Sequence, residues 1–330
     1  MKYQNELLDL WKSKLDEPKE AAKILSEVLH VSLDSAYRRM RGDTALSFDE
    51  GVKLMQLSGL GSGALTGGSK NQIPFFRNGA IDTSEKLAEV YRNNGQHIAN
   101  IKADNGHLYY LAKDVPIFYN FLYPSIARFK TFVWMRSLYN FGNQPAELFD
   151  SRSSENQLAS DGLDMAMNYQ KLSSVEFWTD STVSSMLKQV KYYYELGAIK
   201  SVQVAIDLLD EFGKLVDLVF RQAELGLKVN PTNLEPIPNT SFTLYYHELL
   251  VMDNSVLGIG EVRKLYFAPY SGLNYLSTTD PDYCDEIVQW CKDQMNNSVQ
   301  ISESGHKERV RFQRRIHQQI DTLKEYIRLF

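Results

Sequence analysis

The residues best suited to recognition chemistry lie between positions 34 and 41. Charged and polar side chains follow the helical spacing i, i+3, i+4, i+7 and therefore share one face: Asp34, Tyr37, Arg38 and Arg41. Arginine is the side chain that most often reads guanine O6 and N7, through two hydrogen bonds in the major groove. The spacing predicts a helix with a face that could contact nucleic acid.

Short helices are predicted around this face. The first carries an apolar stripe at helical spacing: Ala21, Ile24, Leu25 and Val28. His30 and Val31 interrupt the pattern, and Ser32 is a good N-cap for the next helix. That helix is predicted over Leu33 to Arg41, with three residues packed inward: Leu33, Ala36 and Met40.

Two further sequence signals mark where helices end and begin in this region. Gly42 ends the second helix as a C′ residue would. Ser47-Phe48-Asp49-Glu50 is a capping box, which predicts a third helix running to about Leu57. Two helices joined by a three- to four-residue turn, the second bearing arginines, form the helix-turn-helix pattern.

Over residues 1–60 the chain resembles the phage-repressor-like (Cro/Xre) helix-turn-helix DNA-binding family. Leu29-His30-Val31-Ser32 matches the turn, and Arg38 to Gly42 matches the end of the recognition helix. The family usually has Gly in the turn, where this chain has His30, a residue that tolerates positive φ better than most. The remainder of the chain is not covered by the resemblance.

The pattern and the resemblance imply a sequence-specific DNA-binding transcriptional regulator, with helix 33–41 in the major groove of double-stranded DNA. The residues expected to contact bases are Asp34, Tyr37, Arg38 and Arg41. The residues expected to contact the DNA backbone are Ser32, Arg39, Thr44 and Lys23. Because one module with a modest basic face would bind weakly, we expect a homodimer formed through the C-terminal region.

The charge balance keeps other interpretations open. The formal net charge is −5, and acidic residues outnumber basic ones within residues 1–60. If this region binds DNA, its positive electrostatic potential must be concentrated at Arg38–Arg41, with Lys23 and Lys53 nearby. The alternatives are an ordinary three-helix packing unit and a protein-interaction scaffold or antitoxin-like partner whose N-terminal bundle does not bind DNA.

The sequence also indicates the cellular location of the protein and whether it carries catalytic or metal-binding motifs. The N-terminal residues lack the apolar region of a signal peptide, and no apolar run is long enough to span a membrane. Cys284 and Cys291 lie seven residues apart, and we expect two buried, reduced thiols in a cytoplasmic protein. No catalytic motif or metal-ligand spacing stands out, so we expect no cofactor and no enzyme, although a C-terminal enzyme stays open.

A glycine-rich stretch at 58–72 predicts a linker between two domains. The predicted domains are a helix-turn-helix domain at 1–60 and a sensor or oligomerisation domain at 73–330. The second domain is predicted to be mainly α with a small antiparallel sheet (α+β). Its expected strands are 107–112 and a meander of 242–252, 256–259 and 262–267.

Two segments of the predicted C-terminal domain allow two interpretations each. Phe118–Tyr139 is rich in aromatic residues and could form a ligand pocket for a small-molecule effector, but a ring-filled helical core is favoured. The last helix, 306–330, carries an apolar seam that favours core packing over a dimer interface: Ile316, Ile320, Leu323, Ile327 and Phe330. Its first half is basic, which usually means a solvated face.

Overall fold

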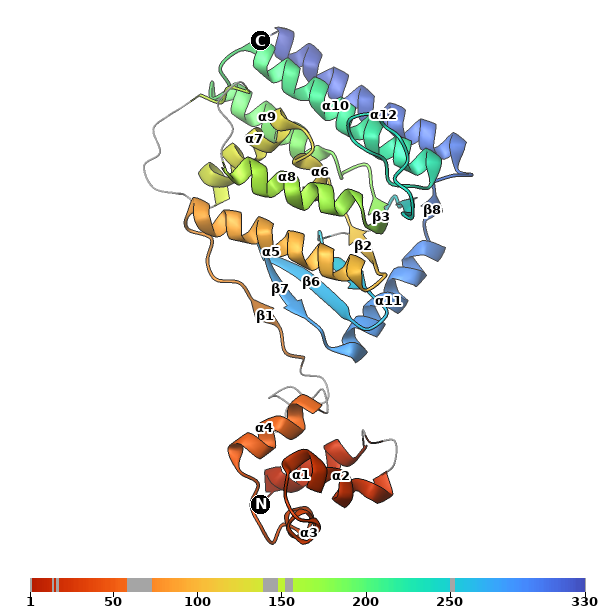
Figure 1. Cartoon of the computed structure of the whole chain (residues 1–330). Helices are drawn as coiled ribbons and strands as arrows, with labels where there is room; N and C mark the ends of the chain where they lie inside the picture. Colours follow the sequence, from red (N-terminus) through yellow and green to blue (C-terminus); the bar gives the residue numbers. More distant parts are fainter. Residues whose placement is uncertain are drawn as a thin grey trace. The chain divides into compact units, whose positions relative to one another are not determined.

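Contacts within the chain separate two units, Met1–Pro74 and Phe75–Phe330, which are described one at a time. The computed structural model describes residues 2–13, 15, 18–57, 73–138, 148–151, 157–249 and 253–329 (Figure 1). The predicted linker at 58–72 lies outside the described residues. Independent folding of the two units stays a prediction.

The N-terminal unit is built from short amphipathic helices. Its elements are α1 (Lys2–Ser13), the 3-10 turn η1 (Pro18–Glu20), α2 (Ala21–Leu29), α3 (Leu33–Arg41) and α4 (Phe48–Leu57). One small core joins these helices: Leu7, Leu8, Trp11, Ala21, Leu25, Ala36 and Leu54. The helix bounds expected for residues 33–41 and up to Leu57 are confirmed.

The C-terminal unit is organised on an eight-stranded mixed sheet. Its described strands are β1 (Phe76–Arg77), β2 (His107–Leu111), β3 (Ser173–Trp178), β4 (Phe242–Tyr246), β5 (Val256–Ile259), β6 (Lys264–Ser271), β7 (Asn274–Thr278) and β8 (Val299–Gln300). Their order is β1-β7-β6-β5-β2-β3-β4-β8. Strands β2, β3 and β4 are parallel neighbours, and the other pairings are antiparallel. The segments that connect these parallel strands contain helices, as is usual for parallel pairing.

The α+β class is confirmed, but the small antiparallel sheet is wrong. The predicted meander is broken at its first strand: β4 pairs in parallel with β3 and lies three positions from β5 in the sheet. β5 pairs with β2 and β6 instead. Local patterns identify strands, but the partner of each strand depends on contacts far away in sequence.

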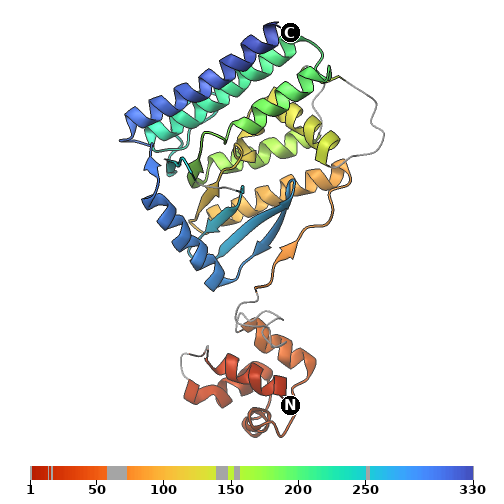
Figure 2. The ribbon, with the colours of Figure 1, turned by 180° about the vertical axis from the view of Figure 1, so that it is seen from behind.

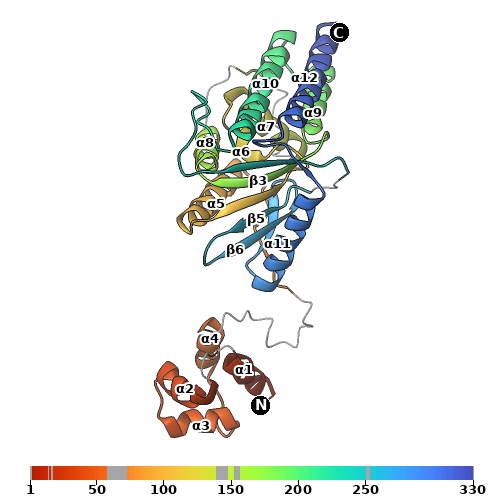
Figure 3. The same cartoon turned by 90° about the vertical axis from the view of Figure 1, so that its right-hand side faces the viewer.

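Helices cover both faces of this sheet (Figure 2, Figure 3). One face packs against α11 (Pro281–Asn296), whose Cys284 and Cys291 are buried against Tyr109 and Tyr266. The other face carries α5 (Ser84–Ala103), α6 (Ile117–Asn120), α7 (Pro124–Val133), the π-helix Trp134–Leu138, α8 (Gln157–Gln170), α9 (Ser184–Glu195), α10 (Val202–Leu225) and α12 (His306–Leu329). None of the helices within the described ranges is long and apolar enough to cross a membrane.

The two segments that allowed two interpretations, 118–139 and 306–330, both contribute to the core of the C-terminal unit. Rings of the aromatic segment pack into one large cluster, including Tyr119 and Phe129, both fully buried. The seam of α12 is buried as well, at Ile316, Ile320 and Ile327, and α12 packs along α10. Tyr139 and Phe330 lie outside the described residues. The seam therefore stabilises the unit's own core.

Candidate nucleic-acid interface

The turn between α2 and α3 has the backbone that the sequence predicts. His30 ends α2 in the left-handed region, with φ of 55°, and Val31 N donates to the carbonyl of Ser26 at 3.0 Å. Ser32 Oγ accepts a hydrogen bond from Ser35 N at 3.2 Å, which confirms the N-cap of α3. Gly42, with φ of 80°, ends α3 as the C-cap. Three residues therefore separate two well-capped helices.

The outer face of α3 is open to solvent. Its exposed side chains are Ser32, Leu33, Asp34, Tyr37, Arg38 and Arg41. The prediction that Leu33 packs inward is wrong, because its side chain is 48% exposed, whereas Ala36 is fully buried. The small core of this unit is filled by other residues of α1, α2, α3 and α4, and Leu33 is not part of it. Leu33 and Tyr37, which is 46% exposed, add apolar surface to the charged face.

The arginines of this face differ in their partners. Arg38 makes no hydrogen bond or ion pair through its side chain to a described residue. Arg41 Nε lies 2.9 Å from Asp43 Oδ2, and both side chains are more than half exposed. Such an exposed pair contributes little and exchanges readily with solvent or ligand. Both guanidinium groups can therefore reach an anion or a base edge.

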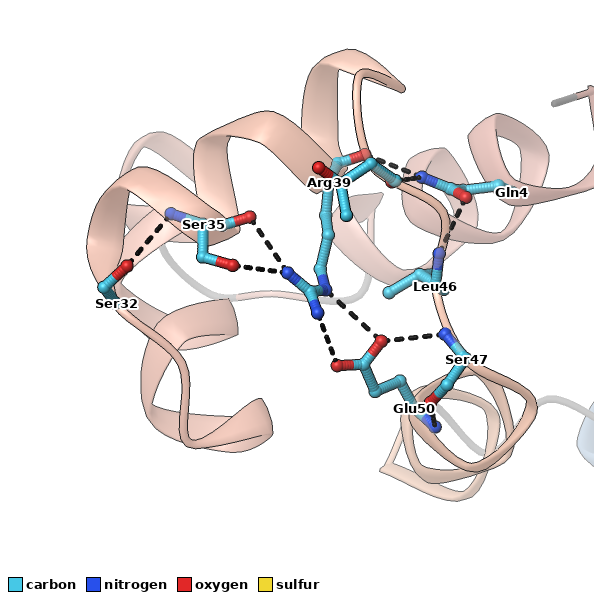
Figure 4. A network of polar contacts seen from close by, with 8 residues as sticks. Gln4, Ser32, Ser35, Arg39, Leu46, Ser47 and Glu50 are labelled. Atoms are coloured by element: carbon cyan, nitrogen blue, oxygen red, sulfur yellow. Dashed lines mark hydrogen bonds and ion pairs between the residues drawn. The ribbon is translucent and has the colours of Figure 1, made fainter.

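Arg39 lies in an intramolecular network instead (Figure 4). Its guanidinium binds the Glu50 carboxylate at 2.9 Å and 3.2 Å, and it also donates to Ser35 Oγ. The two paired side chains are only 14% and 18% exposed. We therefore assign Arg39 a structural role, in place of the phosphate contact expected from the sequence.

Glu50 links this network to the start of α4. Glu50 N donates to Ser47 Oγ at 3.2 Å, and Ser47 N donates to Glu50 Oε2 at 2.8 Å, which confirms the capping box. Burial by itself would raise the pKa of the Glu50 carboxyl, but the hydrogen bonds from Arg39 and Ser47 outweigh it and hold the pKa below its usual value. One carboxylate thus caps α4 and orients α3.

Gln4 of α1 is a positioning residue that the sequence analysis missed. Its amide donates to the carbonyls of Arg39 and Thr44, both at 2.9 Å, and accepts from Leu46 N at 3.0 Å (Figure 4). These contacts hold the loop after α3. No pattern near residue 4 indicates the role, because its partners lie 35 to 42 positions away.

The remaining predicted backbone contacts lie at the edges of this unit. Ser32 and Lys23 are exposed, and Thr44 is half-buried. Lys23 Nζ lies 3.4 Å from Glu20 in an exposed i, i+3 pair on α2. These three side chains come from α2, the turn and the loop after α3, and no hydrogen bond or ion pair among the described residues joins them to one another.

Replacing Glu50 tests the network by stability. We expect Glu50→Gln to destabilise the N-terminal unit by about 1–2 kcal/mol at pH 7, since Arg39 keeps its charge without its partner. Because the folded-state pKa of Glu50 is depressed, its contribution is present above the unfolded value and is lost as the pH falls through the folded value. The gap between wild type and variant should therefore narrow below about pH 4.5.

Chemical denaturation followed by circular dichroism from pH 3 to pH 7 measures this gap. Asp43→Asn is the matched control, because it removes an exposed pair on the same module. Its effect should stay within about 0.5 kcal/mol. Equal effects of the two variants would contradict the structural role of Glu50.

A second polar cluster lies inside the C-terminal unit. Glu176 of β3 accepts hydrogen bonds from Tyr119 at 2.6 Å, Tyr169 at 2.6 Å and Trp178 at 2.9 Å. Lys228 Nζ lies 3.5 Å from the same carboxylate, and both charged side chains are 0% exposed. Burial lowers the pKa of Lys228 to about 8, although Glu176 partly opposes it. We interpret this sealed cluster as part of the core.

The two cysteines are the next side chains that could be reactive. Cys284 and Cys291 are buried free thiols, and burial raises their pKa values to about 11 and about 12. Across the parts of the chain that the structure describes, no three His, Cys, Asp or Glu side chains gather to hold a metal ion. The exposed face of α3 is the candidate interface that the sequence predicts.

Comparisons with known proteins returned no match: no family model, no curated protein and no solved structure is similar to this chain.

Proposed function

We propose that this chain is a sequence-specific DNA-binding transcriptional regulator that acts in the cytoplasm. The observation that carries the proposal is the outward face of α3, which follows a three-residue turn and presents Arg38 and Arg41 with no buried partner. An α-helix with its side chains is about 10–12 Å in diameter, which fits a major groove about 12 Å wide.

In this proposal, some side chains contact the bases of the DNA and others contact its phosphates. Arg38 and Arg41 read guanine O6 and N7, while Asp34 and Tyr37 contact neighbouring bases or backbone. The contacts to phosphates come from residues at the edges of the face: Ser32, Lys23 and Thr44. Arg39 orients α3 through Glu50 and does not contact DNA directly.

The C-terminal unit supplies dimerisation and effector sensing in this proposal. A homodimer would contact two half-sites about 34 Å apart, one turn of the double helix. Two modules bound together would raise the affinity that one modest basic face lacks.

Fluorescence anisotropy of the full chain tests the proposal, using DNA selected from a random pool at two salt concentrations. We expect Arg38→Ala and Arg41→Ala each to cost about 1–3 kcal/mol on the selected site. The control Arg328→Ala removes an exposed arginine at the end of α12 and should leave binding unchanged. Wild-type affinity in both α3 variants would refute the recognition face.

A protein partner is the second candidate, favoured by the apolar side chains on the same face. Leu33 and Tyr37 are about half exposed beside the arginines, and residues 1–60 carry an acidic excess. A scaffold or antitoxin-like partner would bind through this apolar surface with little dependence on salt, whereas DNA binding weakens steeply as salt rises. The salt series separates the two functions.

A further inference from the structure

One side of the β6–β7 hairpin is left partly uncovered. Tyr266 of β6 is buried under α11, whereas its neighbour Phe267 points to the α5 side and contacts the ring of His97 at 5.2 Å between centroids. Phe267 and Tyr275 remain only half-buried. In Figure 1, α5 crosses the sheet and the strands β6 and β7 extend beyond it. The apolar and aromatic side chains of β6 and β7 beside α5 are therefore not covered by a helix.

A cleft of about 580 Å³ opens along this border. Its walls come from α5, from the start of β6 and from the end of β7, and include His97, Asn100, Ile101, Arg263, Leu265 and Thr279. A separate crevice of about 30 Å³ lies beside it and is lined by Phe267, Tyr275 and Phe118. His97 and Ile101 line both spaces. A cleft of this volume is within the range that binds small organic molecules.

Three charged side chains line the cleft, those of Asp104, Arg263 and Lys264. Asp104 accepts backbone hydrogen bonds from Val262 at 3.1 Å and Arg263 at 2.9 Å, so its carboxylate is used in the β5–β6 turn. Lys264 pairs with Asp285 of α11. The guanidinium of Arg263 makes no ion pair or hydrogen bond to the described residues. The Arg263 guanidinium is therefore available to pair with an anionic group in the cleft.

His97 supplies a polar group deeper in the cleft. Its ring is half-buried against Phe267, and burial lowers its pKa, so the imidazole is neutral near pH 7. A neutral imidazole offers one donor and one acceptor to a ligand. The cleft thus combines apolar walls at Ile101 and Leu265, one neutral polar group and one exposed cation.

We propose that this cleft binds a small amphipathic monocarboxylate, with its apolar or aromatic body against Ile101 and Leu265 and its carboxylate paired with Arg263. The arginine fork matches a carboxylate in two hydrogen bonds. In the proposed regulator, a ligand of this class would be the effector. That regulatory role rests on the proposed function, whereas the binding of the ligand to the cleft does not.

Isothermal titration calorimetry of the full chain tests the site with 3-phenylpropionate and with its amine counterpart, 3-phenylpropylamine. We expect saturable binding of the acid and none of the amine. Arg263→Gln should weaken acid binding about tenfold. Asn100→Trp should abolish it, because the indole fills the cleft from an exposed position of α5 where folding is not disturbed. The control Arg311→Gln, on exposed α12 surface, should bind as wild type does.

Three results would overturn the site: no saturable acid binding up to about 10 mM, equal binding of acid and amine, or wild-type affinity in both cleft variants. The titration contains no DNA. Failure of acid binding would therefore leave DNA recognition intact, and failure of DNA binding would leave the titration unchanged.

Discussion

Lys228→Met is expected to destabilise the C-terminal unit by about 3–5 kcal/mol, the cost of leaving a buried charge without its partner. The Lys228 ammonium lies 3.5 Å from Glu176 and over the ring of Tyr169 at 3.9 Å. Neither charged side chain touches solvent, so water cannot replace the lost contact. Methionine has a similar shape, which keeps the cavity term small.

Chemical denaturation of the full chain measures this loss, with Lys113→Met as the control. Lys113 is exposed, so its replacement should change the free energy of unfolding by less than about 0.5 kcal/mol. The double variant Glu176→Gln/Lys228→Met should be less destabilised than the sum of its single variants, because no charge is then left unpaired. Strictly additive losses would rule out the coupling.

Leu25→Ala is expected to destabilise the N-terminal unit by about 2–5 kcal/mol, the usual cost of emptying a buried leucine site. Leu25 is fully buried in the small core that α1, α2, α3 and α4 share. A unit of this size has only a small free energy of unfolding, so the loss should unfold it and abolish the proposed DNA binding. If the two units fold independently, the C-terminal unit should keep its stability.

Hydrogen exchange followed by mass spectrometry reads the two units separately in one experiment. Leu33→Ala is the matched control, because Leu33 is 48% exposed on the next helix. It should change the protection of the N-terminal unit by less than about 0.5 kcal/mol. Unchanged protection of α1, α2 and α4 in Leu25→Ala would contradict the core assignment, and lost protection in both units would contradict independent folding.

The helices of this protein could be predicted because their signals are local. Ser32, Gly42 and the Ser47–Glu50 capping box mark helix ends through contacts within a few residues, and the structure confirms each of them. The long helix α12 likewise follows from apolar periodicity, which indicates the buried face directly.

The sheet could be predicted only in part. β2 was recognisable as a strand, whereas β3 was missed: Glu176 interrupts its apolar run, and only partners from other elements make that carboxylate acceptable in a core. The parallel pairing of β4 with β3 depends on how the α9–α10 crossover packs, which no local pattern encodes.

By itself, the sequence determined the helix-turn-helix backbone and a face carrying Asp34, Tyr37, Arg38 and Arg41, because caps and helical spacing act within one or two turns. Only the tertiary structure decided which neighbouring side chains join that face. It turned Arg39 toward Glu50, eleven residues away on α4, and left Leu33 exposed. It also formed the cleft beside α5, because its walls come from elements more than 150 residues apart.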